Sequence, residues 1–299
     1  MQKTTLLNLL NYASIPWRLR QALAWLGKRV TETRINWIKN KQINLFARYF
    51  PINWHEAEYG EAKDYPTFNA FFTRRLKAGT RPIDKTPDTL IFPVDGFVSQ
   101  YGDIEDDTLL QAKGFYYGVT ELVGDAALAQ RFKNGQFITL YLAPQNYHRV
   151  HIPYEANLSQ MRYIPGRFFS VNAATTQTTP QLFTRNERVV TVFETEQGPL
   201  AVVFVAAGLV ASVVTPWAGA VCPPHGDKVH AWDYSKKTEE GITFNRGEEI
   251  GYFALGSTVV ILTPEKSLEW CRPMAEQEPV KMGEAMARWK HVVRTYTGL

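Results

Sequence analysis

The chain has 299 residues, 45% of them hydrophobic and 13% aromatic, and a formal net charge of +4 at pH 7. This length and composition suit one large core, or a core with a helical appendage, and they exclude a disordered or low-complexity chain. The two cysteines are too few for a disulfide framework, so we expect a protein that is cytosolic or faces the cytosol.

The N-terminal part of the chain is basic, because residues 1–50 contain nine Lys or Arg and one acid, Glu32. A helix is predicted from Ser14 to Gly27, with an apolar stripe and interfacial aromatic side chains at Leu19, Ala22, Leu23, Leu26, Trp17 and Trp25. This pattern favours an anionic membrane surface over a nucleic acid, although a helix packed on its own core has the same pattern. We expect residues 1–62 to be a basic, amphipathic helical region that docks on membranes.

The rest of the chain, residues 63–299, is predicted to be rich in β-strands. Thr67 can cap a short helix that carries three phenylalanines. From Leu90 onward, short β-branched or aromatic runs alternate with turn residues, as in "FITLYLA", "RVHIPY", "VVTVFETE", "LAVVFV" and "STVVILT". We therefore expect an α+β fold with a β-rich catalytic body, and a terminal helix in "VKMGEAMARWK".

The longest apolar run extends from Leu200 to Val214 and has Gly208 in its middle. It is shorter than the roughly 18 to 20 residues that a membrane-spanning helix needs. Its valine content predicts two buried strands with a kink. We expect a protein that sits on the membrane without crossing it.

Two histidines, His148 and His151, stand close together in "YLAPQNYHRVHIP". Residues three apart on an extended strand point to opposite faces, so a turn near Asn146 is needed to bring both rings to one site. No further ligand set stands at a recognisable spacing, so we expect no metal. On spacing alone, a pair of hydrogen-bonded structural histidines is the favoured explanation.

One acid and one serine complete a possible catalytic set with His151. Asp95, in "FPVDGFVSQ", follows an apolar segment and precedes a glycine, where it can form a turn or orient a histidine. Ser257, in "ALGSTVV", lacks the G-x-S-x-G elbow that presents a hydrolase serine to an outside substrate. Gly256 has no Cβ, so the Ser257 hydroxyl can approach the Gly256 carbonyl.

Several motifs together resemble a known family. They are "FFTRRL", "RPID", "PVDG", "QAKG", "YHRVH", "FSVN", "NERV" and "LGST", and they run in the family's order from Tyr65 to Thr263. On these motifs the chain resembles the bacterial phosphatidylserine decarboxylases, pyruvoyl-dependent carboxy-lyases of the membrane.

The resemblance implies self-cleavage between Gly256 and Ser257. The products would be a β chain of residues 1–256 and an α chain of residues 257–299, whose first residue becomes a pyruvoyl group derived from Ser257. This covalent group would be the cofactor, with no bound external cofactor. It would form a Schiff base with the amine of phosphatidylserine and so yield phosphatidylethanolamine for phospholipid biosynthesis.

The resemblance also assigns roles to the other residues. His151 would remove the proton from the serine, and Asp95 would orient His151, as in a serine-protease triad. His148 would orient the substrate or protonate it. Tyr141 and Ser170 are weaker candidates for substrate binding.

The resemblance further implies a peripheral protein on the cytoplasmic face of the cell membrane. Its partners would be phosphatidylserine, the anionic membrane surface and a second copy in a homodimer, with no nucleic acid. Three alternatives stay open at this point: a soluble pyruvoyl decarboxylase of free amino acids, an ordinary serine hydrolase, and a non-catalytic membrane-binding module.

Overall fold

The computed structural model describes residues 26–27, 29–207, 212–222, 226–235, 241–254 and 257–290. Of the helix predicted from Ser14 to Gly27, only the last two residues belong to the described part of the chain. Gly256 lies outside the described residues. Among the described helices, none combines the length and the apolar composition that crossing a bilayer takes.

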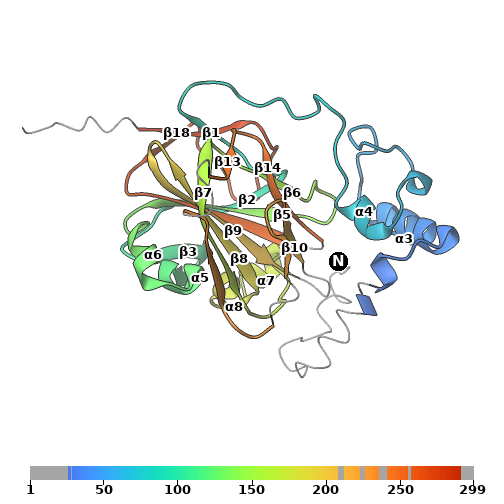
Figure 1. Ribbon diagram of the computed structural model, residues 1–299, viewed down its shortest axis with the longest axis horizontal. Coiled ribbons are helices and arrows are strands. Elements are labelled where there is room, and N and C mark those ends of the chain that lie inside the picture. Colours follow the sequence, from blue (N-terminus) through green and yellow to red (C-terminus); the bar gives the residue numbers. More distant parts are fainter. Residues whose placement is uncertain are drawn as a thin grey trace, which may run out of the picture.

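A large antiparallel sheet forms the body of the protein (Figure 1). Within the described residues it has nine strands in the order β12-β7-β8-β9-β15-β5-β2-β17, with β13 paired to β7. Their bounds are β2 (Gly96–Asp103), β5 (Gln136–Leu142), β7 (Ala156–Ile164), β8 (Arg188–Thr195), β9 (Gly198–Ala206), β12 (His230–Asp233), β13 (Thr243–Phe244), β15 (Ser257–Thr263) and β17 (Pro279–Val280). The five quoted runs fall on strands of the structure, so the prediction of a β-rich body is confirmed.

Strand β15 lies in the middle of this sheet, between β9 and β5, and all seven of its residues are buried. Val259 and Ile261 belong to the hydrophobic core on one face of the sheet. Val260 and Leu262 belong to the core on the other face. Because successive side chains of a strand point to opposite faces, β15 is covered on both sides.

Smaller sheets flank the body. They have the orders β1-β18-β16, β11-β10-β14-β6 and β3-β4. Their bounds are β1 (Thr89–Ile91), β3 (Thr108–Ala112), β4 (Phe115–Gly118), β6 (Arg149–His151), β10 (Val213–Thr215), β11 (Gly219–Cys222), β14 (Glu249–Phe253), β16 (Leu268–Trp270) and β18 (Ala285–Trp289). The apolar run from Leu200 to Val214 contributes to β9 and to β10, so the prediction of two strands there is confirmed.

The terminal helix predicted in "VKMGEAMARWK" is wrong, because these residues contribute to β17 and β18. Strand β18 is paired on one side with β1 and on the other with β16. Gly283, at φ +93°, forms the turn before it. The two ladders satisfy the backbone groups that a helix would have satisfied internally, which overrides the helical propensity of the alanines and methionines.

The helices lie outside the large sheet (Figure 1). They are α3 (Asn36–Tyr49), the 3₁₀ turn η2 (Ala62–Asp64), α4 (Phe68–Phe72), α5 (Val119–Val123), α6 (Ala126–Gln130), α7 (Ala173–Thr176) and α8 (Leu182–Arg185). The predicted cap of α4 is present, since Thr67 Oγ1 accepts a hydrogen bond from Ala70 N at 3.0 Å. Ile43 of α3 packs with the phenylalanines of α4 in a cluster separate from the two sheet cores.

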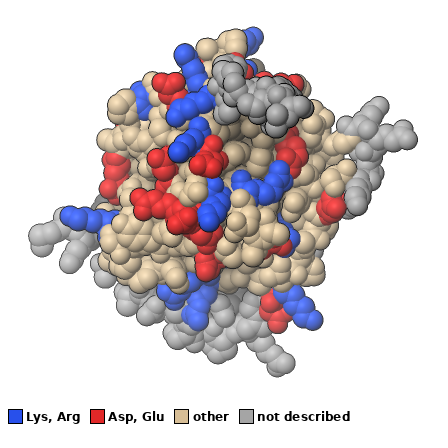
Figure 2. All heavy atoms as spheres, turned by 90° about the vertical axis from the view of Figure 1, so that its left-hand side faces the viewer, with Lys and Arg blue, Asp and Glu red and all other residues tan. Residues whose placement is uncertain are grey.

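The face of the molecule turned away from α3 and α4 carries a mixed surface. Figure 2 shows acidic and basic side chains interspersed over this face among uncharged residues. A surface of alternating sign offers little electrostatic attraction to an anionic bilayer.

Candidate active site

Ser257 is the first residue of β15 and is fully buried. Its backbone pairs with Leu142 of β5 and with Ala206 of β9. Since both neighbours are strands of the large sheet, the serine hydroxyl is fixed in the interior and does not face solvent.

The side chain next to the Ser257 hydroxyl is His148. Its Nδ1 lies 3.4 Å from Ser257 Oγ, and its Nε2 lies 3.3 Å from the carbonyl oxygen of Pro144. A carbonyl oxygen only accepts, so Nε2 carries the hydrogen and Nδ1 accepts the hydroxyl proton of Ser257. The His148 ring stacks on Phe72 of α4, with ring centroids 4.1 Å apart. Burial, helped by the charge of Arg74, lowers the pKa of His148 to about 3, so the ring is neutral.

His151, on β6, is held by two different groups. Its Nδ1 lies 2.7 Å from the carbonyl oxygen of Gly247 and therefore donates to it. Its Nε2 lies 2.9 Å from the Tyr147 hydroxyl and accepts from it. Burial lowers the pKa of His151, while the Gly247 carbonyl and the negative charges of Glu249 and Asp95 raise it part of the way back.

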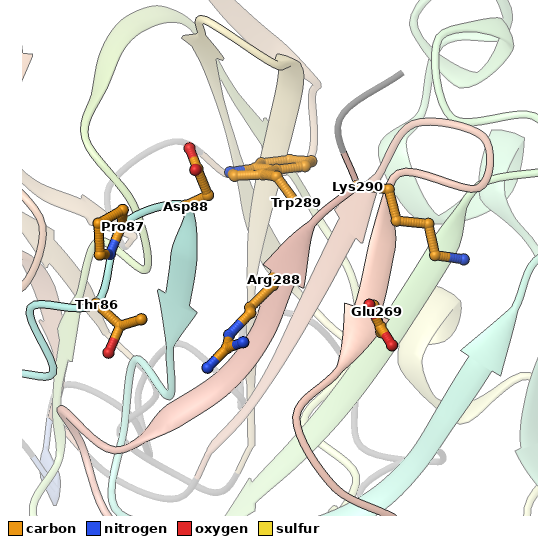
Figure 3. Close-up of a pocket in the computed structure, with 7 residues that line it drawn as sticks. All are labelled: Thr86, Pro87, Asp88, Glu269, Arg288, Trp289 and Lys290. Atoms are coloured by element: carbon orange, nitrogen blue, oxygen red, sulfur yellow. The ribbon is translucent and has the colours of Figure 1, made fainter. Parts of the chain in front are cut away.

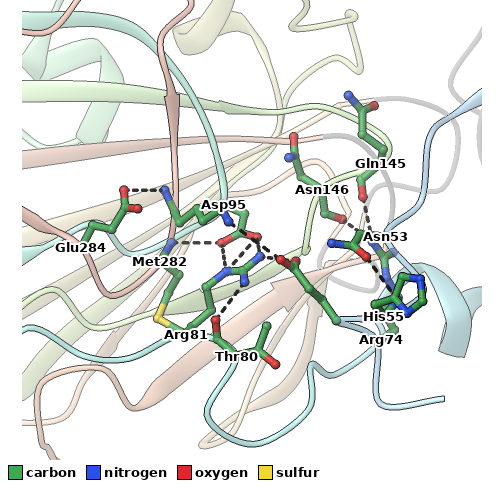
Figure 4. A network of polar contacts seen from close by, with 12 residues as sticks. Asn53, His55, Arg74, Thr80, Arg81, Asp95, Gln145, Asn146, Met282 and Glu284 are labelled. Atoms are coloured by element: carbon green, nitrogen blue, oxygen red, sulfur yellow. Dashed lines mark hydrogen bonds and ion pairs between the residues drawn. The ribbon is translucent and has the colours of Figure 1, made fainter. Parts of the chain in front are cut away.

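Asp95 lies in the bend before β2 and is buried. It accepts hydrogen bonds from Arg81 Nε at 2.9 Å, from Arg81 Nη2 at 2.5 Å and from Met282 N at 3.0 Å. Arg81 Nη2 also donates to Glu56 at 2.7 Å, so one guanidinium joins two carboxylates (Figure 4). The hydrogen bonds that Arg81 donates to Asp95 and Glu56 raise the pKa of the guanidinium further.

The predicted site residues are therefore brought together in part. His148 contacts Ser257, and the turn predicted near Asn146 is present, with Asn146 N bonded to Ala143 O at 2.9 Å. His151 N bonds to Pro93 O at 2.9 Å, which places the segment of Asp95 beside that of His151. Among the described residues, no hydrogen bond joins Asp95 to His151 or His151 to Ser257.

Neither of the two weaker candidates has a hydrogen bond to the other candidate site residues in the described part of the chain. Tyr141, on β5, pairs with Thr258 across the ladder, and burial raises the pKa of its hydroxyl. Ser170 lies before α7, and its Oγ accepts from Asn172 N at 3.5 Å. The described residues contain no group of three or more His, Cys, Asp or Glu side chains placed to hold a metal ion.

Several residues that contact the site were missed as site residues, among them Phe72, Arg81 and Tyr147. Phe72 and Arg81 both belong to motifs quoted above, "FFTRRL" and "RPID", but no role was assigned to them. Arg81 precedes an apolar strand, and a charged residue in that position indicates a buried ion pair. The spacing of residues in the sequence does not show which acid is its partner.

Two of the pockets formed by the described residues differ in their position relative to the candidate site residues. One, of about 250 Å³, lies against Asp95 and Tyr147 and also contacts Arg74 and Arg81. The other, of about 480 Å³, lies over the ends of β16 and β18 and is lined by Thr86, Pro87, Asp88, Glu269, Arg288, Trp289 and Lys290 (Figure 3). The larger pocket contains none of the candidate site residues, so the smaller pocket is the one relevant to the site.

The buried histidines predict a loss of stability in mild acid. In the unfolded chain an imidazole titrates near 6.5, whereas folded His148 titrates at about 3. Between these values the unfolded state binds more protons, so the free energy of unfolding falls by about 1.4 kcal/mol per pH unit for this histidine. Urea unfolding between about pH 7 and about pH 5 measures the slope. The variant His148→Gln is expected to show a shallower slope, and an unchanged slope would contradict the assignment.

The fold and the site together define a class of β-rich proteins with a buried serine at the start of a central strand. In this chain the serine is Ser257, and the buried His148 contacts it from another part of the fold. A family model described as phosphatidylserine decarboxylase matches residues 68–288. The chain belongs to the phosphatidylserine decarboxylase family.

Curated relatives extend the similarity to most of the chain. A phosphatidylserine decarboxylase proenzyme of Nitrosococcus oceani is 45% identical over 277 residues, covering 92% of this chain and 90% of the relative. One of a Polaromonas species is 46% identical, covering 90% of this chain and 95% of the relative. One of Shewanella baltica is 48% identical, covering 84% of this chain and 86% of the relative.

Proposed function

We propose that this chain decarboxylates phosphatidylserine to phosphatidylethanolamine in phospholipid biosynthesis. The observation that carries the proposal is the identity of 45% to 48%, over most of the chain, with proteins named phosphatidylserine decarboxylase proenzyme. The word proenzyme further supports a chain that processes itself before it acts.

Self-processing is proposed at the bond between Gly256 and Ser257. The Ser257 oxygen would attack the Gly256 carbonyl carbon and convert the amide into an ester. Elimination would then release the Gly256 carboxylate and leave a dehydroalanine at position 257, which water converts into a pyruvoyl group with loss of ammonia. The burial of Ser257 supports this route, because the hydroxyl is kept from bulk water and is bonded to a neutral histidine.

His151 is proposed as the base of this step, with Asp95 as its orienting carboxylate. Burial lowers the pKa of His151, and the Gly247 carbonyl together with the negative charges of Glu249 and Asp95 offsets part of that lowering, which favours proton uptake. To take the Ser257 proton, His151 Nε2 has to exchange the hydroxyl of Tyr147 for that of Ser257.

His148 is proposed to act in the decarboxylation. The pyruvoyl carbonyl supplies an electron sink, since it can condense with the substrate amine and accept the electron pair left when carbon dioxide departs. The position beside His148 Nδ1, where Ser257 Oγ lies now, fits this group. A neutral His148 would orient the substrate by accepting a hydrogen bond at Nδ1. Tyr141 and Ser170 remain proposed as weaker substrate contacts.

Intact mass spectrometry of the purified protein tests the cofactor. We expect two chains that meet at Gly256 and Ser257, the smaller one carrying a pyruvoyl group in place of an N-terminal serine. A single chain of 34.1 kDa would contradict the proposal.

Membrane docking by residues 1–62 is proposed on the outer face of α3. Trp37, Lys41, Leu45 and Arg48 recur at helical spacing on this face and are exposed. Trp37 is 71% exposed and Leu45 52%, although Ile43 on the opposite face is fully buried. Exposed apolar and basic side chains on one stripe support a peripheral protein on the anionic, cytoplasmic face of the cell membrane. Residues 63–299 would form the catalytic domain, and a homodimer of the cleaved unit is proposed from the family resemblance.

The double variant Trp37→Ala with Leu45→Ala is expected to weaken binding to phosphatidylserine vesicles by at least about tenfold, because two exposed apolar side chains no longer insert. Self-cleavage is expected to be unchanged. Co-sedimentation with vesicles measures the binding. Tyr116→Ala removes an exposed aromatic side chain from β4 and is the matched control, with no loss expected. Equal binding by the double variant and the control would rule out this face.

A further inference from the structure

Arg74 is a buried cation whose hydrogen bonds are incomplete. It follows α4, is 5% exposed, and lines the pocket of about 250 Å³ beside Asp95. Its Nη2 donates to the carbonyl oxygens of Gln145 at 2.7 Å and Asn146 at 3.3 Å (Figure 4). Its Nε and Nη1 have no hydrogen-bond partner among the described residues. A buried donor without a hydrogen-bond partner lowers the stability of the fold. An arrangement that costs stability indicates a role other than a structural one.

A second buried arginine shows what a purely structural one looks like in this fold. Arg188 is 3% exposed, and its Nε donates to Leu122 O. Its Nη1 donates to the carbonyls of Thr184 and Asn186, and its Nη2 to that of Glu121. All three nitrogens of Arg188 are used by backbone carbonyls, whereas only one nitrogen of Arg74 is used.

The charge of Arg74 is also not balanced within its pocket. The charged side chains among the described residues that line the pocket are Glu56, Arg74, Arg81, Asp95 and Lys281. Arg81 is paired with both carboxylates, and Lys281 lies 3.8 Å from Glu56. Two acids therefore meet two bases before Arg74 is counted, and the pocket has an excess of one positive charge. It is suited to a ligand with one negative charge.

Arg74 is linked to the candidate active site through the backbone that leads to His148. Its two carbonyl partners belong to the residues that precede Tyr147 and His148 in the chain. His148 in turn contacts Ser257 Oγ. An anion held by Arg74 would therefore lie at the edge of the site where the headgroup reacts.

We propose that Arg74 binds the phosphodiester group of the lipid headgroup, an inference that rests on the proposed function. The Arg74 guanidinium keeps its positive charge, and its unpartnered Nε and Nη1 lie on different edges of the plane, so either one can donate a charge-assisted hydrogen bond to a phosphate oxygen. The substrate also has a carboxylate, but decarboxylation removes that negative charge. A cation paired with the carboxylate would stabilise the substrate more than the transition state and would slow the reaction. The phosphodiester keeps its charge throughout, so a cation can hold it without this penalty.

Steady-state kinetics of the self-cleaved enzyme with two soluble substrates test the proposal. Glycerophosphoserine has the phosphodiester, the amine and the carboxylate. O-acetylserine has the same amine and carboxylate but no phosphate. Arg74→Met is expected to raise KM for glycerophosphoserine by about 10- to 100-fold and to leave kcat/KM for O-acetylserine unchanged. Arg75→Met removes the same charge from the next, exposed position and is expected to change neither. An equal loss on both substrates would overturn the proposal, because it would indicate a structural role.

Arg74→Lys guards against a failure of Arg74→Met to fold. It keeps the charge but places a single ammonium donor at a different point, so an intermediate KM is expected for glycerophosphoserine. An Arg74→Lys enzyme with the wild-type KM would overturn the phosphodiester contact.

Inorganic phosphate separates this inference from the proposed function. Phosphate is expected to raise the Tm of the wild type and of Arg75→Met, to raise that of Arg74→Lys by less, and to leave that of Arg74→Met unchanged. This readout stands even if no substrate is decarboxylated, in which case the proposed function fails alone. If phosphate stabilises the wild type through Arg74 while KM for glycerophosphoserine is insensitive to Arg74, the site takes free phosphate and the headgroup proposal is overturned.

Discussion

Replacing Ser257 with alanine is expected to leave the chain uncut and without decarboxylase activity. The change removes the only oxygen that can attack the Gly256 carbonyl from this side chain, and with it the source of the pyruvoyl group. Ser257 makes one long hydrogen bond, of 3.4 Å, to His148, so the loss of stability is expected to be about 1 kcal/mol and the protein still folds. Intact mass spectrometry and carbon dioxide release from phosphatidylserine measure the two outcomes.

A matched control is available in the same sheet. Ser159, on β7, is buried and donates to the Val192 carbonyl oxygen at 3.0 Å. Ser159→Ala deletes a buried hydroxyl of the same kind away from the site, and we expect it to cleave and to act normally. Normal cleavage or activity in Ser257→Ala would end the proposal of serine-derived self-processing.

The variants His151→Ala and His148→Ala are expected to affect different steps. The first is expected to impair self-cleavage, and the second is expected to impair decarboxylation. His151→Ala should slow self-cleavage by about 10²- to 10⁴-fold, the usual range for loss of a general base. His148→Ala should still be cleaved but should lose decarboxylation by a similar factor. The physical reason is basicity: burial lowers the pKa of both rings, to about 3 at His148, whereas at His151 the Gly247 carbonyl and the charges of Glu249 and Asp95 offset part of the lowering.

This pair of variants separates proximity from basicity, because the structure places His148 and not His151 beside Ser257 Oγ. Gel electrophoresis over time gives the cleavage rate, and carbon dioxide release from the cleaved fraction gives the catalytic rate. If His148→Ala stays uncut while His151→Ala is cleaved, the nearer ring is the base and the assigned roles are reversed.

The strands of the body could be predicted from the sequence because their signal is local. In "STVVILT" an unbroken apolar and β-branched run indicates a strand buried on both faces, which is where β15 lies. The C-terminal strand β18 could not be predicted in the same way. Its alanines and methionines have helical propensity, and only pairing with β1 and β16, contributed by distant residues, makes it a strand.

The residue types of the site were predictable, but the contacts between them were not. Ser257 and His148 are 109 residues apart and meet only because β15 enters the large sheet beside β5. Asp95 was expected to form a turn or to orient a histidine, and it does lie in a bend, but its hydrogen bonds go to Arg81 and Met282. Sequence spacing carries no information on which of several buried groups a carboxylate will face.

The central place of β15 has a consequence for the protein after cleavage. The α chain would contribute β15, β16, β17 and β18, and three of these pair with strands of the β chain: β15 with β5 and β9, β17 with β2, and β18 with β1. Cutting the backbone before β15 would therefore leave the two chains interleaved within the large sheet and within the sheet of β1, β18 and β16, and they could separate only by unfolding. Before the cut, these strands find one another within a single molecule at a high effective concentration. After the cut, refolding would require two separate chains to meet. The refolding rate of the cleaved enzyme would therefore depend on protein concentration, whereas that of the uncut precursor would not.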